Sequence, residues 1–143
     1  MKALTIWQPW ASMAAVGIKH NETRGYPTNY RGAIAIHAGK KSVNEIWSAY
    51  LDERAREVIC RRLNLSGHTG LEIFPLGCVL ATANLVECIK ITPEFVATLS
   101  PDELALGDYT LGRYAWKLAD VKQFPAPIPA RGQQGLWEWE GMR

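Results

Sequence analysis

Three charged side chains lie close together near the start of the 143-residue chain: Lys19, Glu22 and Arg24. Two cations that flank one carboxylate can form a polar pocket, in which the acid orients the cations and the cations meet an anionic or polar ligand. The same residues could instead form a surface ion pair, which contributes about 0–1 kcal/mol of stability. Both alternatives stay open at this point, and the local pattern favours the ligand pocket.

Catalysis by the same group is a second hypothesis. Glu22, or Glu87 if its side chain points inward, could activate water while Lys19 stabilises a developing oxyanion. In phosphate chemistry, Lys19 and Arg24 could instead stabilise a phosphorane-like charge. Lys19 and Glu22 are therefore the candidate catalytic residues, although neither scheme has a complete set of residues in the sequence.

The neighbouring residues predict how these charges are positioned. Residues 8–16 are typical of a short helix, which Gly17 can end in a left-handed conformation. Lys19 follows closely, where the carboxyl end of a helix favours a cation. Residues 20–24 can be extended, which places Glu22 and Arg24 on one face of a strand and Thr23 on the other.

The rest of the chain predicts one long helix and several strands. Residues 42–65 carry an apolar stripe at helical spacing, and Ser42 with Glu45 matches a capping box at its start. Residues 66–70 are expected to be a loop, and short helices are expected to begin at residues 92–94 and 101–103. Strands are expected at residues 33–38, 77–91, 114–118 and 136–139, with an edge or loop at residues 123–129.

One residue of the long predicted strand has an unresolved direction. Glu87 has the same parity as Val79 and Leu85, so a regular strand would turn its carboxylate inward, toward a cleft or the core. A β-bulge would reverse that assignment. The order of elements lacks regular βαβ alternation. It therefore predicts a single α+β domain over residues 1–143, with a curved sheet or small barrel flanked by helices.

Composition excludes several classes of protein. No segment approaches the ~20 apolar residues needed to span a bilayer. The first residues resemble a strand and lack the pattern of a signal peptide, so we expect a cytoplasmic protein without a membrane partner. The three cysteines and the three histidines are widely spaced, which predicts no disulfide framework and no metal site. The patterns GxxxxGK[ST] and GxGxxG are missing, so we expect no cofactor.

A family resemblance covers nearly the whole chain. Gly17, Lys19, Glu22 and Arg24 match every specified position of the signature GxKxxExR of the ASCH family. Further segments resemble the same family in the same order: residues 4–11, 30–38, 75–79, 114–116 and 132–137. The resemblance implies a PUA-like small β-barrel with flanking helices, in which the signature lines a cleft between the first helix and the barrel.

The resemblance also implies a range of activities. The family is associated with RNA or DNA binding, including in transcription coactivators, while some relatives look like nucleases. Some very small relatives resemble amidohydrolases that act on N4-acetylcytidine, with a lysine and a threonine of the signature and a distant acid. Lys19 matches that lysine, but Glu22 occupies the threonine position.

We therefore expect a nucleic-acid-binding module, with RNA or another single-stranded nucleic acid as its partner. The alternative is a small hydrolase: a ribonuclease, for which a divalent metal is conceivable, or an enzyme that acts on a modified nucleoside. Trp10 could stack on a base or pack in the core. Arg131 and Gln134 are placed at the cleft by the resemblance. The candidate ligand-binding residues are Trp10, Lys19, Glu22, Arg24, Arg31, Lys40, Lys41, Arg131 and Gln134.

Overall fold

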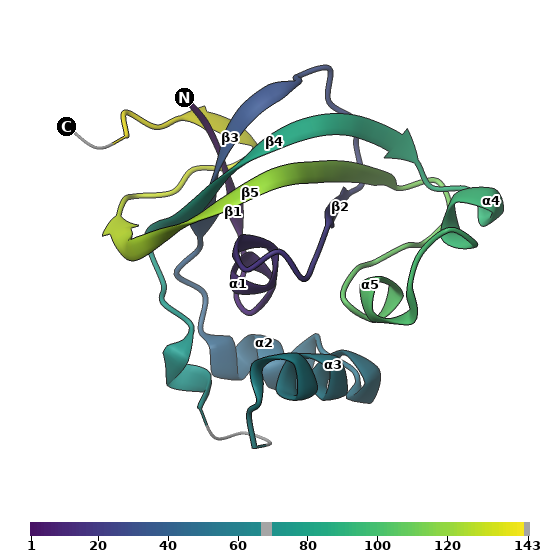
Figure 1. Ribbon diagram of the computed structural model, residues 1–143, viewed down its shortest axis with the longest axis horizontal. Coiled ribbons are helices and arrows are strands. Elements are labelled where there is room, and N and C mark those ends of the chain that lie inside the picture. Colours follow the sequence, from purple (N-terminus) through teal and green to yellow (C-terminus); the bar gives the residue numbers. More distant parts are fainter. Residues whose placement is uncertain (67–69, 142–143) are drawn as a thin grey trace.

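A computed structural model describes residues 1–66 and 70–141, and its largest element is a six-stranded sheet. The spatial order is β2-β5-β4-β3-β1-β6, and β1 runs parallel to β3 while the other neighbours are antiparallel. The sheet curls into a half-barrel (Figure 1), which confirms the α+β class expected from the sequence. The strands are β1 Lys2–Ile6, β2 Asn21–Arg24, β3 Gly32–Ala38, β4 Cys78–Lys90, β5 Tyr114–Pro129 and β6 Leu136–Glu138.

The helices lie mainly below the hollow of the sheet (Figure 1). They are α1 Trp10–Ala15, α2 Val43–Ala49, α3 Glu53–Leu63, α4 Pro93–Val96 and α5 Pro101–Ala105, with a 3-10 turn, η1, at Leu71–Ile73. The small residues Ala11 and Ala14 of α1 pack in the core of the sheet. Met13, on the other side of α1, packs with Ile46 of α2 and Ile59 of α3. The short helix is therefore the middle layer of the fold.

The two ends of α1 are held by specific hydrogen bonds. At the start, the backbone N–H of Ser12 donates to the buried side-chain oxygen of Gln8 at 2.9 Å. At the end, Gly17 has a φ of +82°, so the predicted left-handed stop is confirmed. The backbone N–H groups of Ile18 and Lys19 both donate to the carbonyl of Met13 at 3.0 Å. This tight turn leads the chain directly into β2.

The long helix predicted over residues 42–65 is wrong, because the chain forms α2 and α3 with a break between them. Asp52 begins the second helix: its Oδ1 accepts from the backbone N–H of Ala55 at 2.9 Å. Arg56 donates from Nε to the carbonyl of Trp47 at 3.0 Å, and so supplies a hydrogen-bond partner to a backbone carbonyl in the last turn of α2. The capping box is also wrong, since the side chain of Ser42 makes no capping hydrogen bond.

The remaining predictions agree with the structure more closely. The register of β4 shifts between Leu85 and Glu87, and Glu87 is exposed, so the bulge alternative is confirmed. Residues 123–129 belong to β5, where their described neighbour is β4 alone, as expected of an edge. The two short helices begin after capping side chains, Thr92 and Ser100. Residues 67–69 of the predicted loop lie outside the described residues.

Among the residues that the structure describes, no helix has the length and apolar character to cross a bilayer.

Candidate functional site

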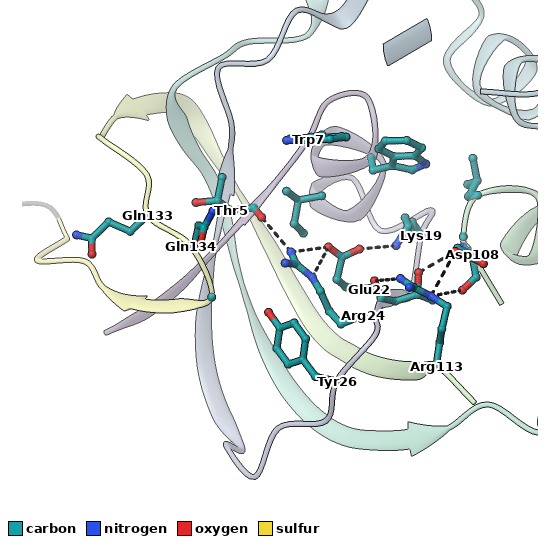
Figure 2. Close-up of a pocket in the computed structure, with 16 residues that line it drawn as sticks. Thr5, Trp7, Lys19, Glu22, Arg24, Tyr26, Asp108, Arg113, Gln133 and Gln134 are labelled. Atoms are coloured by element: carbon teal, nitrogen blue, oxygen red, sulfur yellow. Dashed lines mark hydrogen bonds and ion pairs between the residues drawn. The ribbon is translucent and has the colours of Figure 1, made fainter. Parts of the chain in front are cut away.

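A pocket of about 690 Å³ lies where the signature residues meet the end of β1. Its walls come from β1, α1, β2, the segment between α5 and β5, and residues 133–135 before β6. Figure 2 shows Arg24 and Glu22 in the middle of this group, with Trp7 and Tyr26 on opposite sides. The volume is in the range of small-molecule and cofactor sites.

The charged centre of the pocket is a hydrogen-bonded triad of Lys19, Glu22 and Arg24. Lys19 Nζ lies 3.3 Å from Glu22 Oε1 and also donates to the carbonyl of Asn21. Arg24 donates to Glu22 Oε2 from Nε at 3.2 Å and from Nη2 at 2.8 Å. Arg24 Nη2 also donates to the carbonyl of Thr5 at 3.0 Å, which joins β2 to β1. The predicted shared face of Glu22 and Arg24 is confirmed.

Burial makes this triad different from a surface ion pair. Lys19 is 2% exposed and Glu22 is 9% exposed, so both charges are largely removed from water. The triad carries one net positive charge, and each oxygen of Glu22 already accepts from a cation. In the part of the chain that the structure describes, Arg24 Nη1 and one N–H of Lys19 donate to no protein acceptor. These donors are available to a ligand that offers phosphate or carbonyl oxygens.

The start of β2 is held by a buried acid from far along the chain, Glu103 of α5, which is 4% exposed. Its carboxylate accepts from the backbone N–H of His20 at 2.7 Å and of Asn21 at 3.4 Å. The hydroxyl of Tyr109 donates to it at 2.9 Å. Burial, followed by the charge of Glu103, raises the pKa of Tyr109 far above its ordinary value, so the phenol stays a donor.

A neutral hydrogen-bond chain fixes the wall formed by β1 and the segment before β6. His37 Nε2 donates to the carbonyl of Ala130 at 2.7 Å, which leaves Nδ1 to accept from the hydroxyl of Thr5 at 3.1 Å. The indole N–H of Trp137 donates to the same Thr5 oxygen at 3.0 Å. Burial lowers the pKa of His37, which favours this neutral form. Gly132 fits closely here, since a Cβ would lie 2.6 Å from the His37 ring.

Another wall of the pocket contains Thr23 and Arg113. Thr23 borders the pocket although it was predicted to face away from Glu22, and its hydroxyl accepts from the backbone N–H of Asp108 at 3.3 Å. Arg113 Nη2 donates to the carbonyl of Thr23 at 3.3 Å. A hydrogen bond from the Thr110 hydroxyl lowers the pKa of Asp108, so this carboxylate is ionised beside the arginine. The pocket therefore extends past β2, the strand at one edge of the sheet, to the segment between α5 and β5.

The candidate residues from the sequence divide into two sets. Trp10, Lys19, Glu22, Arg24 and Gln134 line the pocket, and Trp10 also packs against the core of the sheet and against the apolar residues of α2 and α3. The residues that do not line it are Arg31, Lys40, Lys41 and Arg131.

Each of these outlying residues has an identifiable place. Arg31 is exposed and donates to the carbonyls of Thr28 and Tyr30. Lys41 lies over the ring of Trp7, while Lys40 and Arg131 are exposed.

Several pocket residues had no signal in the sequence. Trp7, Tyr26, Asp108 and Arg113 line the pocket because distant segments meet there. Glu103 stands three residues after Ser100, and this spacing indicates a capping box rather than a contact with β2. Among the described residues, no three or more His, Cys, Asp or Glu side chains gather as metal ligands would.

Comparison with known proteins identifies the family. Residues 4–128 match the ASCH domain, which is most of the chain. Activating signal cointegrator 1 is 31% identical over 92 residues in Homo sapiens and 32% identical over 92 residues in Mus musculus. Each match covers 61% of this chain but 14% of the relative, so the chain spans a small part of those proteins. The half-barrel with its helices agrees with a PUA-like fold, and the chain belongs to the ASCH domain family.

Proposed function

We propose that this chain binds RNA, or another single-stranded nucleic acid, with one nucleotide in the pocket. The triad of Lys19, Glu22 and Arg24, in which the lysine and the glutamate are buried, is the observation that carries the proposal. It holds one net positive charge and N–H donors that the described protein atoms do not use. Nucleic acids offer phosphate and base oxygens as acceptors, and the family resemblance points to the same class of ligand.

The remaining walls suit the other parts of a nucleotide. Trp10 and Tyr26 offer aromatic surface to a base, and Gln134 offers a side-chain amide that can both donate and accept. The pocket volume of about 690 Å³ accommodates a ligand of this size. A pocket with two cationic side chains and aromatic walls therefore suits a nucleotide better than an apolar ligand.

The same geometry favours binding over hydrolysis. Both oxygens of Glu22 accept from cations, so this acid is poorly placed to take a proton from water. Lys19 serves as a donor to two protein acceptors, which suits electrostatic positioning better than nucleophilic attack. The ribonuclease and amidohydrolase alternatives are therefore outcomes of the test rather than parts of the proposal.

Binding of a fluorescein-labelled, short single-stranded RNA at low salt, measured by fluorescence anisotropy, tests the proposal. Lys19→Met and Arg24→Met each remove a charged donor, so Kd should rise by about 10-fold to 150-fold. Lys122→Met is the matched control, because Lys122 is an exposed cation outside the pocket and its replacement should leave Kd unchanged. Urea unfolding of each variant shows whether it is folded at the assay temperature.

Two further measurements separate the alternatives. Binding should weaken steeply with added salt and should not change with EDTA, because the proposal involves phosphate contacts and no metal. Failure to bind any RNA or DNA at low salt would overturn the proposal. Release of acetate from N4-acetylcytidine, or RNA cleavage that Lys19→Met abolishes, would replace it with a hydrolase.

A further inference from the structure

An aromatic and basic cluster lies directly beside the pocket: Trp7, Tyr50 and Lys41, named the aromatic platform. The ring centroids of Trp7 and Tyr50 are 5.4 Å apart, with an interplanar angle of 61°. Lys41 Nζ lies 4.6 Å from the centroid of the Trp7 ring and 5.5 Å from that of Tyr50. Trp7 also lines the pocket (Figure 2), so the platform and the pocket are continuous.

The rings of Trp7 and Tyr50 are not part of the buried core. Trp7 is 40% exposed and Tyr50 is 56% exposed, whereas Trp47 and Trp116 are each 1% exposed. Large aromatic side chains are stabilised by burial, so a pair left on the surface beside a cation is a feature of an interaction site. The pair joins two elements, because Trp7 follows β1 and Tyr50 ends α2.

We propose that the aromatic platform is a second nucleotide subsite, which holds the nucleotide adjacent to the one in the pocket. This inference rests on the proposed function. The adjacent base stacks on the exposed ring of Tyr50 and meets Trp7 at its edge, because the two rings are inclined by 61°. Lys41 contacts the phosphate of the same nucleotide. Such stacking accepts any base, because every base has a π-face. A lysine over an exposed ring is held weakly, so its ammonium group can turn to a phosphate.

The subsite defines the ligand class more narrowly than the pocket does. A free nucleoside fills the pocket alone, whereas a strand of two or more nucleotides fills both positions. Stacking of one base contributes a factor of roughly 5 to 150 in affinity. The chain is therefore expected to select a single strand over a mononucleotide by about this factor, with little preference for the sequence at the second position.

The test compares the Kd of a uridine mononucleotide with that of a labelled oligouridylate, measured by competition anisotropy. In the unmodified protein the oligonucleotide should bind roughly 5- to 150-fold more tightly. Tyr50→Ala should reduce this ratio while the Kd of the mononucleotide stays the same, and Tyr50→Phe, which keeps the ring, should restore it. Lys41→Gln should reduce the slope of log Kd against log salt concentration for the oligonucleotide by about the contribution of one phosphate contact.

The outcomes distinguish this inference from the proposed function. If both ligands bind and Tyr50→Ala lowers only the melting temperature, the cluster is a structural contact and the second subsite is wrong. If neither ligand binds at low salt, the proposed function fails and the subsite fails with it. If the ratio collapses in Tyr50→Ala and recovers in Tyr50→Phe, the platform is established as a stacking site.

Discussion

Two clusters of this molecule have the same composition, one carboxylate between two cations, but different surroundings. Glu22 lies between Lys19 and Arg24 in the pocket, and Asp102 of α5 lies between two arginines of α3. The surface cluster has the shorter contacts, 2.8 and 2.7 Å, against 3.3 and 2.8 Å in the pocket. The side chains of its arginines are 51% and 40% exposed, whereas those of Lys19 and Arg24 are 3% and 22% exposed.

The comparison teaches that burial, rather than contact distance, decides what an ion pair does. Exposed pairs are solvated and screened with or without their partner, so they contribute little stability. A buried charge depends on its partner, and removal of that partner leaves a charge that water does not stabilise. The surface cluster therefore joins α3 and α5, while the triad holds two cations at the wall of the pocket.

The largest predicted effect comes from breaking the buried cluster. Glu22→Gln leaves Lys19 and Arg24 facing each other without a carboxylate, and the free energy of unfolding should fall by about 3–5 kcal/mol. Urea unfolding followed by circular dichroism measures the change. Glu87→Gln is the matched control, since it is the same substitution at an exposed site on β4. Equal losses in the two variants would contradict the role assigned to burial.

A smaller effect is expected from His37, which is as buried as Lys19 but neutral. Its pKa in the folded state lies below the ordinary value of 6.5, chiefly because of burial. The unfolded state therefore binds the proton more readily, and stability should fall as the pH drops below 6.5.

The midpoint of urea unfolding at about pH 7.5 and about pH 5.5 measures this dependence. The acids with lowered pKa values, such as Asp102 and Glu138, titrate below this range and do not interfere. In His37→Gln the midpoint should change less between the two pH values than in the unmodified protein. An identical pH dependence in both proteins would exclude His37 as its source.

The smallest effect is expected at the surface cluster. Asp102→Asn removes the carboxylate between the two arginines, and both arginines remain solvated. The loss of stability should be several-fold smaller than that of Glu22→Gln and should shrink further in high salt. The same urea titration, with and without added salt, checks it. A loss as large as that of Glu22→Gln would invert the comparison.

Local patterns predicted much of the fold. The stop at Gly17 and the shared face of Glu22 and Arg24 depend on a few neighbouring residues, and both are confirmed. The helix over residues 42–65 failed because its apolar stripe continues in phase across a break. The break depends on Asp52 as a cap and on Arg56 reaching back to α2, and hydrophobic spacing detects neither.

The candidate site could be predicted only where it is local in sequence. Lys19, Glu22 and Arg24 come from one segment, whereas Glu103 meets the start of β2 across more than 80 residues. The Thr5 and His37 chain likewise depends on the parallel pairing of β1 with β3. Such contacts follow from topology, which a single sequence does not specify.

The half-barrel has a seam between β2 at one end of the sheet and β1 with β6 at the other. Arg24 crosses it with a side-chain hydrogen bond to Thr5, in place of the backbone ladder that would close a barrel. The pocket occupies this seam, with β2 on one side and residues 133–135 on the other. A ligand that contacts both sides would therefore link β2 to residues 133–135, which are far apart in the sequence. Occupancy should slow amide hydrogen exchange at both margins together, so the filled site also works as a cross-link of the sheet.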